Sequence, residues 1–478
     1  MQPILTPTEM AAADRRTIAA GTPVEVLMDR AGRAVAWEVR RRLDGVYGQR
    51  ATVVCGKGNN GGDGLVTARI LAGWGMRVDF VALDPPPAPE ALARSLARAD
   101  VLVDAMYGTG FRGALDGAAA DVAAASASHL TVAVDIPSGI DGHTGAAAGP
   151  AVEATATMTF AARKPGLCFE PGRTHAGAVT VADIGIDVGA PALALLEDDD
   201  VSAWLAGSER PPDTNKWKAG LLVVGGSGGM TGAPTFVSRA GLRAGAGIVW
   251  CAVPGTDAAA RGGGSEVITK ALPANDDGDL AGLGDLPASL ERFHAAAIGP
   301  GLGPSDSARA AVRELVAEIP VPLVLDADGL NAFAGDAPAL RDRPAPTVLT
   351  PHEGEYARLT GEPVGSDRVD AARRLAAASG CVALLKGPAT VVADPIGRAV
   401  INPTGGAELA TAGSGDVLTG IIGGLLARGL DPFAAAAAGA FVHGRAADVA
   451  GHTGLIASDL IVALPRALHA LTPGGARS

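Results

Sequence analysis

Short apolar runs alternate with amphipathic stretches along most of the chain, and this alternation predicts strands and helices in two successive series. Apolar runs that are bounded by turn-forming residues and separated by helical patterns are typical of buried parallel strands. The first series reaches from a helix near Met10 to about Asp187. It predicts a doubly wound parallel sheet with strands at residues 51–55, 78–83, 101–103, 130–134 and 178–181.

A second series of the same kind fills the rest of the chain and ends in long Ala-rich helices. Between the two series, residues 187–218 interrupt the pattern with an acidic run and a turn-rich stretch. This interruption predicts two α/β domains, residues 1–214 and residues 215–478. The second series opens with Gly220-Leu-Leu-Val-Val and continues with predicted strands at residues 248–253, 295–298, 323–325, 347–349 and 382–385.

The composition fits two domains that each bury a hydrophobic core. The chain has 478 residues, of which 48% are hydrophobic. Its formal net charge is -12 and it has no run of Lys or Arg, which argues against a nucleic-acid partner. An anionic metabolite is compatible with this charge, because backbone amides and helix N-termini attract anions locally.

The sequence predicts a cytoplasmic protein without a membrane span. The stretch around Glu9, Asp14 and Arg15 predicts an amphipathic helix and not a signal peptide. The longest apolar helical stretch, residues 417–427, is too short to cross a bilayer. We expect reduced, buried side chains for all four cysteines, which show no paired spacing: Cys55, Cys168, Cys251 and Cys381.

A glycine-rich loop follows the first predicted strand, from Gly56 to Gly64. It contains the pattern G-x-G-x-x-G, and Asp84 ends the next strand, as a dinucleotide-binding fingerprint requires. The Asn-Asn-Gly-Gly-Asp segment is unusual for such a loop, because it adds side-chain carbonyls and a carboxylate where a phosphate cradle needs bare amides. The alternative is a structural turn capped by Asp63.

Polar groups also follow the third and fourth predicted strands, beginning with Asp104 and Asp135. Because the carboxyl ends of parallel strands converge on one crevice, we expect these groups and the glycine-rich loop to share a site. Asn60, Asp104 and Ser138 would offer hard oxygen ligands with few charges, which favours a monovalent cation such as potassium. The alternative for each residue is a helix cap or a turn former.

Glycines and polar residues follow several strands of the second series as well: Gly225 to Ala233, Gly299 to Gly303, and Asp326 to Asn331. Further on, Thr350 and Glu353 match a capping box, with Pro351 at the first helical position. This pattern predicts that His352 lies at a helix N-terminus beside the strand ends. The alternative is a structural histidine whose hydrogen bonds are satisfied.

Two motifs of the second half predict phosphate binding. Lys386 and Thr390 flank a Gly-Pro-Ala turn after a strand, which suits the phosphates of a nucleotide, although no Walker loop is present. In the segment Ala412-Gly-Ser-Gly-Asp416, small residues open a long apolar helix, whose amides and dipole form an anion hole. Asp416 is then placed to take a proton from a hydroxyl that attacks a phosphoryl group. The alternative is an acidic residue that stabilises the first helical turn.

Together these motifs resemble two known families. The second half is similar to the ADP-dependent NAD(P)H-hydrate dehydratases, which have a ribokinase-like fold, through the motifs given above. The first half is similar to the NAD(P)H-hydrate epimerases, which have a Rossmann-like fold, through Asn59 to Asp63, Asp104 to Gly113 and Asp135 to Gly139. Because the motifs cover nearly the whole chain, it resembles the fused, bifunctional enzymes that repair hydrated nicotinamide nucleotides.

For the first half, the resemblance implies exchange of the R and S epimers at C6 of hydrated NADH and NADPH. Potassium would be held by Asn60, Asp104 and Ser138, and Asp135 would act as acid or base. Contacts to the hydrated nucleotide would come from Asn59, Asn60, Gly61, Gly62, Asp63, Gly108, Thr109, Gly110, Phe111, Arg112, Gly113, Ala114 and Asp135.

For the second half, the resemblance implies dehydration of the S hydrate to NAD(P)H, with ADP as phosphoryl donor, Mg²⁺ on its phosphates, and AMP and phosphate as products. Asp416 would be the catalytic base and would contact the hydrate together with Ala233, Gly303 and His352. The adenine nucleotide would be held by Lys386, Gly387, Pro388, Ala389, Thr390 and Gly415.

Two positions depart from the family pattern. Asn215 stands where the family often has His, which places a contact there in doubt. Glu408 lies near the expected phosphate site, where its charge would repel the nucleotide, so we expect its side chain to face away.

Three other functions compete with this interpretation. The second half could be a small-molecule kinase, for instance for a vitamin alcohol, with the first half as a regulatory nucleotide-binding module. The first half could also be non-catalytic within a repair enzyme. An NAD-dependent dehydrogenase would use the glycine-rich loop and Asp84, but it gives no purpose to the phosphate motifs. In each case we expect a homo-oligomer that acts on small molecules.

Overall fold

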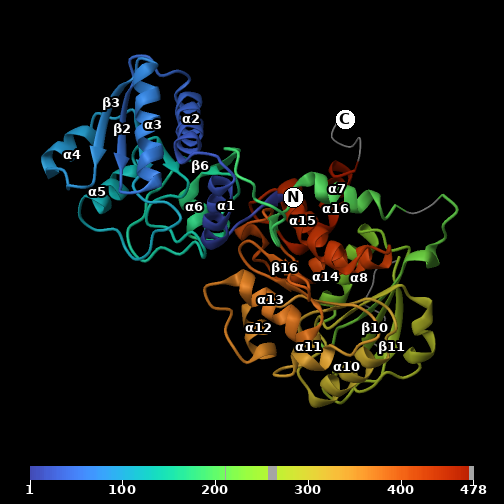
Figure 1. Ribbon diagram of the computed structural model, residues 1–478. Coiled ribbons are helices and arrows are strands. Elements are labelled where there is room, and N and C mark those ends of the chain that lie inside the picture. Colours follow the sequence, from blue (N-terminus) through green and yellow to red (C-terminus); the bar gives the residue numbers. More distant parts are fainter. Residues whose placement is uncertain (210–211, 257–265, 473–478) are drawn as a thin grey trace. The chain divides into compact units, whose positions relative to one another are not determined.

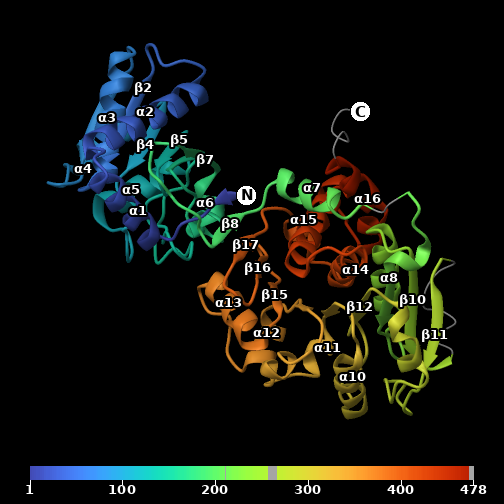
Figure 2. The ribbon, with the colours of Figure 1, turned by 45° about the vertical axis from the view of Figure 1, so that its right-hand side comes forward.

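The chain folds into two compact units in a computed structural model that describes residues 1–209, 212–256 and 266–472. One unit reaches from Gln2 to Leu193, and the other contains Met1 and the chain from Ala194 onward. Figures 1 and 2 show the ribbon from two directions, with the first unit at the blue end of the colour bar. Each unit is an α/β fold on a largely parallel sheet, and the short strands β1 (Gln2–Pro3) and β8 (Leu193–Leu195) lie where the units divide.

The N-terminal unit is a doubly wound sheet of six parallel strands in the order β3-β2-β4-β5-β6-β7. Neighbouring side chains of β2 face opposite sides, since Val53 packs with α2 and α3 whereas Val54 packs with α4 and α5. Helices therefore cover both faces (Figure 1), as a parallel sheet requires. The strands are β2 (Arg50–Cys55), β3 (Arg77–Ala82), β4 (Val101–Ala105), β5 (Thr131–Val134), β6 (Ala156–Phe160) and β7 (Ala178–Ala182). The helices are α1 (Pro7–Ala19), α2 (Val24–Leu43), α3 (Asn59–Gly73), α4 (Pro89–Leu96), α5 (Gly117–Ser126) and α6 (Gly172–Ala176).

This sheet confirms the predicted parallel fold and its five strands, and it adds β6, which the sequence did not predict. The sequence of β6 is Ala-Thr-Met-Thr-Phe, so its threonines interrupt the apolar run. Both hydroxyls are buried with partners, because Thr157 donates to the Ala176 carbonyl at 2.7 Å and Thr159 to the Asp135 carboxylate at 3.0 Å. Buried polar groups that are hydrogen-bonded are tolerated in a sheet interior, and β6 lies between β5 and β7.

The C-terminal unit contains a sheet with the strand order β17-β16-β15-β14-β13-β12-β9-β10-β11. The pairs from β15 to β11 are parallel, whereas β16 is antiparallel to both of its neighbours, β15 and β17. All six predicted strands are confirmed, and β11, β16 and β17 are additional. The strands are β9 (Gly220–Val224), β10 (Ile248–Pro254), β11 (Ile268–Leu272), β12 (Ala295–Ile298), β13 (Leu323–Leu325), β14 (Thr347–Leu349), β15 (Val382–Leu385), β16 (Val391–Ala393) and β17 (Ala399–Ile401). The helices are α7 (Asp198–Ala206), α8 (Gly232–Arg243), α10 (Asp306–Glu318), α11 (Asp328–Asn331), α12 (Glu353–Thr360), α13 (Arg368–Ser379), α14 (Ser414–Ala427), α15 (Pro432–Ala450) and α16 (Ala457–Ala470).

Helix α14 is buried along almost its whole length and packs against α8 through glycines. A Cβ atom added to Gly420 would lie 2.3 Å from the Val237 carbonyl oxygen, and one added to Gly424 would lie 2.6 Å from the Gly241 carbonyl oxygen. The two helix backbones thus approach as closely as glycine allows. This contact fixes the start of α14, and with it Asp416, at the edge of the sheet.

The units divide about twenty residues before the boundary that the sequence predicted between residues 214 and 215. The segment in between contains α7, whose Val201 and Leu205 belong to the core of the C-terminal unit. Arg428 also donates hydrogen bonds to the carbonyls of Leu205 and Ser208. The acidic run Asp198–Asp200 forms the first turn of α7, where negative charge is favoured by the helix dipole, and does not mark a linker.

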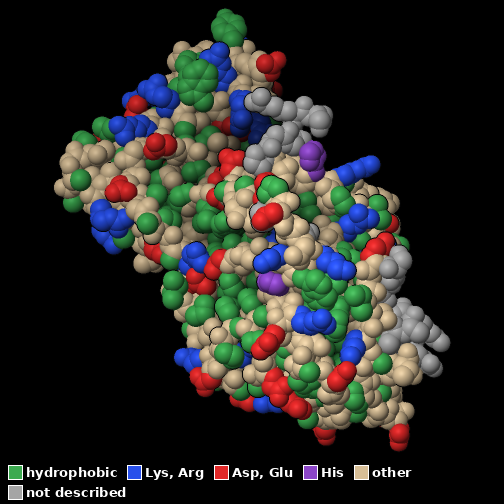
Figure 3. All heavy atoms as spheres, turned by 90° about the vertical axis from the view of Figure 1, so that its right-hand side faces the viewer, with side chains coloured by type: hydrophobic (Ala, Val, Ile, Leu, Met, Phe, Trp, Pro, Cys, Tyr) green, Lys and Arg blue, Asp and Glu red, His purple; other side chains and the backbone are tan. Residues whose placement is uncertain are grey.

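The surface and the cysteines agree with the composition. All four cysteines are free and buried, as predicted. On the face shown in Figure 3, Lys and Arg side chains are interspersed with Asp and Glu side chains rather than gathered in one basic area. None of the helices in the described ranges combines the length and the hydropathy that a membrane span needs.

Replacing Gly424 with Ala should destabilise the C-terminal unit, because the new methyl group would meet the Gly241 carbonyl oxygen at 2.6 Å. Overpacking of this kind costs about 1–3 kcal/mol. Urea unfolding followed by hydrogen exchange of peptides from this unit measures the change. Gly282→Ala is the matched control, since its Cβ would meet only Pro273 at 3.9 Å. Equal midpoints for the two variants would contradict the prediction.

Candidate active sites

The N-terminal unit contains a cavity of about 540 Å³ at the carboxyl ends of β2, β4, β5 and β6. This is the edge where the sequence predicted that polar groups converge. Helices α1 and α2 contribute further lining residues, among them Asp14 and Met28. Of the residues predicted to contact a hydrated nucleotide, the lining includes Asn59, Asn60, Asp63, Gly108, Thr109, Gly110, Phe111 and Asp135.

The other predicted contact residues of this unit lie next to the cavity but not on its lining: Gly61, Gly62, Arg112, Gly113 and Ala114. The glycines around Gly61 serve close packing, since a Cβ on Gly61 would lie 2.0 Å from the Gly56 carbonyl oxygen. Arg112 donates to the carbonyls of Thr109 and Phe111, so it shapes the loop after β4. Asp84, the acidic residue of the dinucleotide fingerprint, forms an exposed ion pair with Lys57 and is not part of the lining.

Asp135 forms an ion pair with Lys164, a residue that the sequence analysis did not single out. The ammonium of Lys164 also donates to the Thr159 hydroxyl at 2.8 Å and to the Phe160 carbonyl at 3.1 Å, and the side chain is 1% exposed. Asp135 itself has a φ of 69°, a conformation that is uncommon outside glycine and recurs at functional sites. Lys164 follows β6, and because β6 was not predicted, no strand end pointed to it.

A second pair of carboxyl groups lies near this ion pair. Burial raises the pKa of Asp63 to about 8, and the charges of Asp135 and Asp14 add to the effect while Lys164 opposes it. Burial also raises the pKa of Asp14. The charge of Lys164 lowers this pKa, and the charge of Asp135 raises it further. Both residues line the cavity. The cavity therefore combines an ion pair with acidic groups that hold protons at higher pH than usual.

Asp104 and Ser138 lie together beneath the cavity, as the potassium hypothesis requires. Asp104 is 0% exposed and accepts hydrogen bonds from the Ser138 amide at 2.8 Å, the Ser138 hydroxyl at 2.6 Å and the Met106 amide at 3.2 Å. Burial raises the pKa of Asp104 to about 6, although these hydrogen bonds lower it. In the part of the chain that the structure describes, no basic side chain pairs with this carboxylate. The third predicted ligand, Asn60, lies beside Gly108, and its buried amide nitrogen has no hydrogen-bond partner among the described residues.

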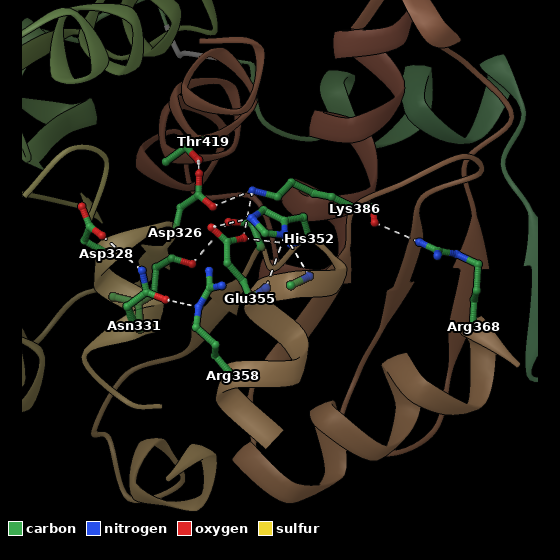
Figure 4. A network of polar contacts seen from close by, with 12 residues as sticks. Asp326, Asp328, Asn331, His352, Glu355, Arg358, Arg368, Lys386 and Thr419 are labelled. Carbon is green, nitrogen blue, oxygen red and sulfur yellow. Dashed lines mark hydrogen bonds and ion pairs between the residues drawn. The ribbon is translucent and has the colours of Figure 1, made fainter. Parts of the chain in front are cut away.

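In the C-terminal unit, Lys386 joins three elements at the carboxyl edge of the sheet (Figure 4). Its ammonium donates to Asp326 at 2.8 Å and lies 3.5 Å from a Glu355 oxygen, while Thr419 of α14 donates to the other Asp326 oxygen at 2.6 Å. Burial alone would lower the pKa of Lys386, but the charges of Asp326 and Glu355 outweigh it and raise the pKa. Lys386 is therefore a fixed positive charge between two buried carboxylates.

Asp416 lies in the first turn of α14, one turn before Thr419. Burial and the charge of Asp326 raise the pKa of Asp416 to about 7, and Lys386 opposes this shift. Gly413 caps the helix with a φ of 85°, and the backbone of Gly415 passes so near that its Cβ would lie 3.7 Å from the Lys386 ammonium. The loop thus presents amides, a helix N-terminus and a carboxyl group that titrates near neutrality.

His352 caps helix α12, so the predicted capping box of Thr350 and Glu353 is wrong. Nδ1 of His352 accepts from the amides of Gly354 at 3.0 Å and Glu355 at 3.3 Å, and Glu355 accepts from the His352 amide at 2.8 Å. Thr350 is instead buried with its hydroxyl bonded to the Leu325 carbonyl. The predicted place of His352, at a helix N-terminus beside the strand ends, is confirmed.

The other predicted contact residues for the hydrate lie on glycine-rich turns. The Gly303 amide donates to Asp328 at 3.1 Å, and Asp328 in turn accepts from Asn331 at 3.1 Å. Ala233 lies in the first turn of α8. It is close to Gly301, since a Cβ added to Gly301 would lie 3.3 Å from the Ala233 Cβ. Figure 4 shows Asp328 and Asn331 on one side of the Lys386 network and His352 on the other.

The predicted nucleotide turn joins β15 to β16, and Arg368 holds it by donating to the Lys386 carbonyl at 2.9 Å. The ammonium of Lys386 is directed at Asp326 and Glu355 rather than along this turn (Figure 4). Gly387 has a φ of 145° and lies under the Arg368 guanidinium, so a larger residue would be strained. Within the turn, Gly387 and Pro388 are exposed, Ala389 is buried and the Thr390 hydroxyl bonds to the Gly387 carbonyl at 3.4 Å.

Four further residues of the C-terminal unit have roles that the sequence did not reveal. Buried Ser414 and His443 are 3.1 Å apart between Oγ and Nε2, and burial lowers the pKa of His443 to about 4, so a neutral imidazole anchors the loop from α15. Glu408 does not face away as predicted, since its side chain is 12% exposed and caps the Gly406 amide at 2.8 Å. Asn215 caps a turn before β9 by accepting from the Trp217 amide at 2.9 Å.

Two protein families match the two halves of the chain. Residues 221–466 match the family described as NAD(P)H-hydrate dehydratase, and residues 24–99 and 86–166 match the family described as YjeF-related protein N-terminus. The chain is 41% identical over 493 residues to the bifunctional NAD(P)H-hydrate repair enzyme Nnr of Moorella thermoacetica, covering 94% of this chain and 93% of that protein. It is 37% identical over 449 residues to the protein of the same name from Escherichia coli K12, covering 87% of this chain and 84% of that protein.

A solved structure supports the fold of the C-terminal unit. A ribokinase-like superfamily protein, EF1790 from Enterococcus faecalis V583, matches with a TM-score of 0.50 and 22% identity, covering 60% of this chain and 99% of that one. At this identity the likeness concerns the fold alone. The C-terminal unit thus has the ribokinase-like fold that the resemblance implied.

Replacing Lys386 with Met should destabilise the C-terminal unit, because Asp326 would remain buried, at 3% side-chain exposure, without its cationic partner. Losing one member of a buried pair costs about 3 kcal/mol. Urea unfolding measures the loss, and the double variant with Asp326→Asn should recover most of it. Lys270→Met is the control, since its Asp285 partner is 75% exposed. A loss no larger than that of the control would refute the role of the pair.

Proposed function

Because the chain belongs to the family of bifunctional NAD(P)H-hydrate repair enzymes, we propose that its two units carry out the two reactions of that repair. The N-terminal unit interconverts the R and S epimers of hydrated NADH and NADPH at C6. The C-terminal unit dehydrates the S epimer to NAD(P)H at the expense of a nucleotide. The protein is thus an isomerase and a lyase that acts on small molecules. Its cytoplasmic location and its homo-oligomeric state stay predictions from the sequence.

The observation that carries the dehydratase proposal is Asp416 at the N-terminus of α14, with a pKa raised to about 7 mainly by burial. Hydroxide is a poor leaving group, and phosphorylation of the C6 hydroxyl turns it into a good one. Asp416 takes the hydroxyl proton, and the amides around Gly413 and Gly415 stabilise the transferring phosphoryl group. Phosphate then leaves as the ring nitrogen donates its electron pair to form an N1=C6 iminium ion, and loss of a proton from C5 gives NAD(P)H. The other products are AMP and phosphate when ADP is the donor.

The nucleotide is proposed to lie along Gly387, Pro388, Ala389 and Thr390 and across Gly415. Lys386 contributes from beneath the loop as a fixed charge, because its ammonium is engaged by Asp326 and Glu355. Within the described residues no cluster of three His, Cys, Asp or Glu side chains could hold a metal ion. This fits Mg²⁺ carried by the phosphates rather than by a protein cage, where it would neutralise their charge.

The hydrate is proposed to bind beside Asp416, in contact with Ala233, Gly303 and His352. Nδ1 of His352 is occupied by helix capping and Nε2 lies 3.4 Å from a Glu355 oxygen, but the side chain is 53% exposed, so the hydrate can reach the exposed part of the ring. Gly303 has a φ of 88°, and a Cβ there would lie 2.1 Å from an Asp279 carboxylate oxygen, so the turn requires glycine at this position. These contacts would place the C6 hydroxyl next to Asp416.

In the N-terminal unit, we propose that the hydrated nicotinamide enters the cavity and that Asp135 acts there as acid or base. Exchange at C6 needs the oxygen to leave, through an iminium or ring-opened state, and to return on the other face. Potassium is proposed to be held by Asn60, Asp104 and Ser138. Asp104 supports this, because a fully buried carboxylate without a basic partner needs a positive charge nearby. A potassium ion there would supply that charge and fix the loops after β4 and β5.

Replacing Asp416 with Asn should abolish dehydration, because loss of a general base lowers the rate about 10²–10⁴-fold. The assay follows the return of NADH absorbance from the S hydrate with ADP or ATP, together with the release of inorganic phosphate. Asp306→Asn is the control, since that side chain is 96% exposed. Near-normal recovery of NADH in the Asp416 variant would exclude the assignment, and a stable phosphorylated product in the unsubstituted protein would favour a kinase.

The dehydration rate should also follow the ionisation of Asp416. Since the pKa of this carboxyl is raised to about 7, the base form increases as the pH rises through that value. We expect kcat/KM for the S hydrate to increase roughly tenfold from pH 6 to pH 8 and then to level off. Stopped-flow or steady-state absorbance across this range measures it, and a flat profile would remove Asp416 as the titrating base.

A further inference from the structure

Of the three carboxyl groups that line the epimerase cavity, those of Asp63 and Asp135 lie in contrasting surroundings. Asp135, after β5, is paired with the Lys164 ammonium, and its Oδ1 accepts from Lys164 and from Thr159. Asp63, in the first turns of α3, is 8% exposed and lines the same cavity. Among the residues that the structure describes, no ion pair or hydrogen bond engages the Asp63 carboxyl group. Its oxygens are therefore left for a ligand in the cavity.

Three charged groups that act on Asp63 come from three different segments of the cavity lining. Asp14 faces it from α1, Asp135 from the end of β5, and Lys164 from the segment after β6. Two of these three groups are acidic, and burial adds to their effect, so the pKa of Asp63 is raised to about 8. Pairs of carboxyl groups whose surroundings favour different protonation states are typical of acid and base partners in enzymes.

We propose that Asp63 is the proton donor of the epimerase reaction and that Asp135, paired with Lys164, is the proton acceptor. This inference rests on the proposed epimerase function and assigns the two proton transfers within it. The outer oxygen of Asp135 is directed to the cavity, since a Cβ on Gly108, itself on the cavity lining, would lie 3.4 Å from Oδ2. Asp135 can thus accept a proton on Oδ2 while Oδ1 stays bonded to Lys164 and Thr159.

The proposed steps conserve atoms and charge. Asp63 transfers its proton to the C6 oxygen, the C6–O bond breaks with its electron pair on the departing water, and the lone pair of N1 forms the N1=C6 bond of an iminium ion. A water molecule then adds to C6 from the other face, and its proton passes to Asp135. Exchange with solvent returns a proton to Asp63 and removes one from Asp135. The reverse reaction runs through the same states in the opposite order.

The test uses the full-length protein, purified R hydrate of NADH, constant potassium and no ADP or ATP, so that dehydration cannot proceed. Chromatography follows the appearance of the S hydrate, with the rate in the absence of protein subtracted. Asp63→Asn should slow the exchange about 10²–10⁴-fold, the usual effect of losing a general acid. Asp135→Asn should also slow it, whereas Asp121→Asn, at an exposed position of α5, should not.

The pH profile separates proton donation from a merely structural role. With the unsubstituted protein, exchange should fall as the pH rises above about 8, because Asp63 loses its proton there. The residual rate of Asp63→Asn should no longer show this fall, and that of Asp135→Asn should keep it. Circular dichroism shows whether Asp63→Asn folds. If it does not, the unsubstituted protein alone tests the proposal: an exchange rate that stays constant or increases from pH 7 to pH 9.5 overturns it.

The outcomes also distinguish this inference from the function on which it rests. If the unsubstituted protein does not interconvert the epimers at any pH, the epimerase function itself is refuted. If it does so and Asp63→Asn retains near-normal exchange with an unchanged pH profile, only the role of Asp63 is refuted.

Discussion

A carboxylate paired with a lysine from another strand end of the same sheet underlies the candidate site of each unit. In the C-terminal unit, Asp326 after β13 is paired with Lys386 after β15. In the N-terminal unit, Asp135 after β5 is paired with Lys164 after β6. In each pair one member is buried, Asp326 at 3% and Lys164 at 1% side-chain exposure. An unpaired charge at such a depth would cost several kcal/mol, so each buried member requires its partner. Thr419 extends the first pair to α14 by donating to Asp326, which ties the phosphate loop to the sheet.

The two pairs have a second consequence, because each leaves another carboxyl group of the same site without a lysine of its own. Burial, together with the charge of the paired carboxylate, raises the pKa of Asp416 to about 7 and that of Asp63 to about 8. Lys386 opposes the rise in the pKa of Asp416 but is paired with Asp326, and Lys164 opposes the rise in the pKa of Asp63 but is paired with Asp135. A similar arrangement therefore yields a base that ionises near neutral pH in one unit and an acid that keeps its proton in the other.

The sequence predicted what depends on local pattern and missed what depends on the order of strands in the sheet. Continuous apolar runs revealed most strands, whereas β6 was hidden by Thr157 and Thr159, whose hydroxyls find partners only in the folded sheet. Because β6 was not predicted, nothing in the sequence indicated that Lys164 follows the end of a strand. It pairs with a residue 29 positions away, because β5 and β6 are neighbours. His443 was missed for a related reason, since nothing in the Ala-rich pattern of α15 indicates that it meets Ser414.

Some local predictions were wrong because several residues can satisfy the same backbone groups. The Thr350 hydroxyl donates its hydrogen bond to the Leu325 carbonyl, and His352 caps α12 instead. Likewise Glu408 turns back to the Gly406 amide instead of facing away from the expected phosphate site. The residues at strand ends were placed correctly even so, because the topology of a parallel sheet fixes where its carboxyl ends meet, whichever side chain serves as a cap.

The chemistry of the two units can be described through one atom, the oxygen on C6 of the hydrated ring. In the proposed dehydratase step this oxygen loses its proton to Asp416 and becomes the nucleophile that takes up a phosphoryl group. In the proposed epimerase step the same oxygen gains a proton from Asp63 and departs as water. The epimerase step needs both a proton donor and a proton acceptor, which Asp63 and Asp135 supply in one cavity, whereas the dehydratase step needs the base Asp416 and a phosphoryl donor. In each unit the lysine fixes one carboxylate and leaves a second carboxyl group to exchange the proton of the C6 oxygen, so the same pairing serves opposite directions of proton transfer.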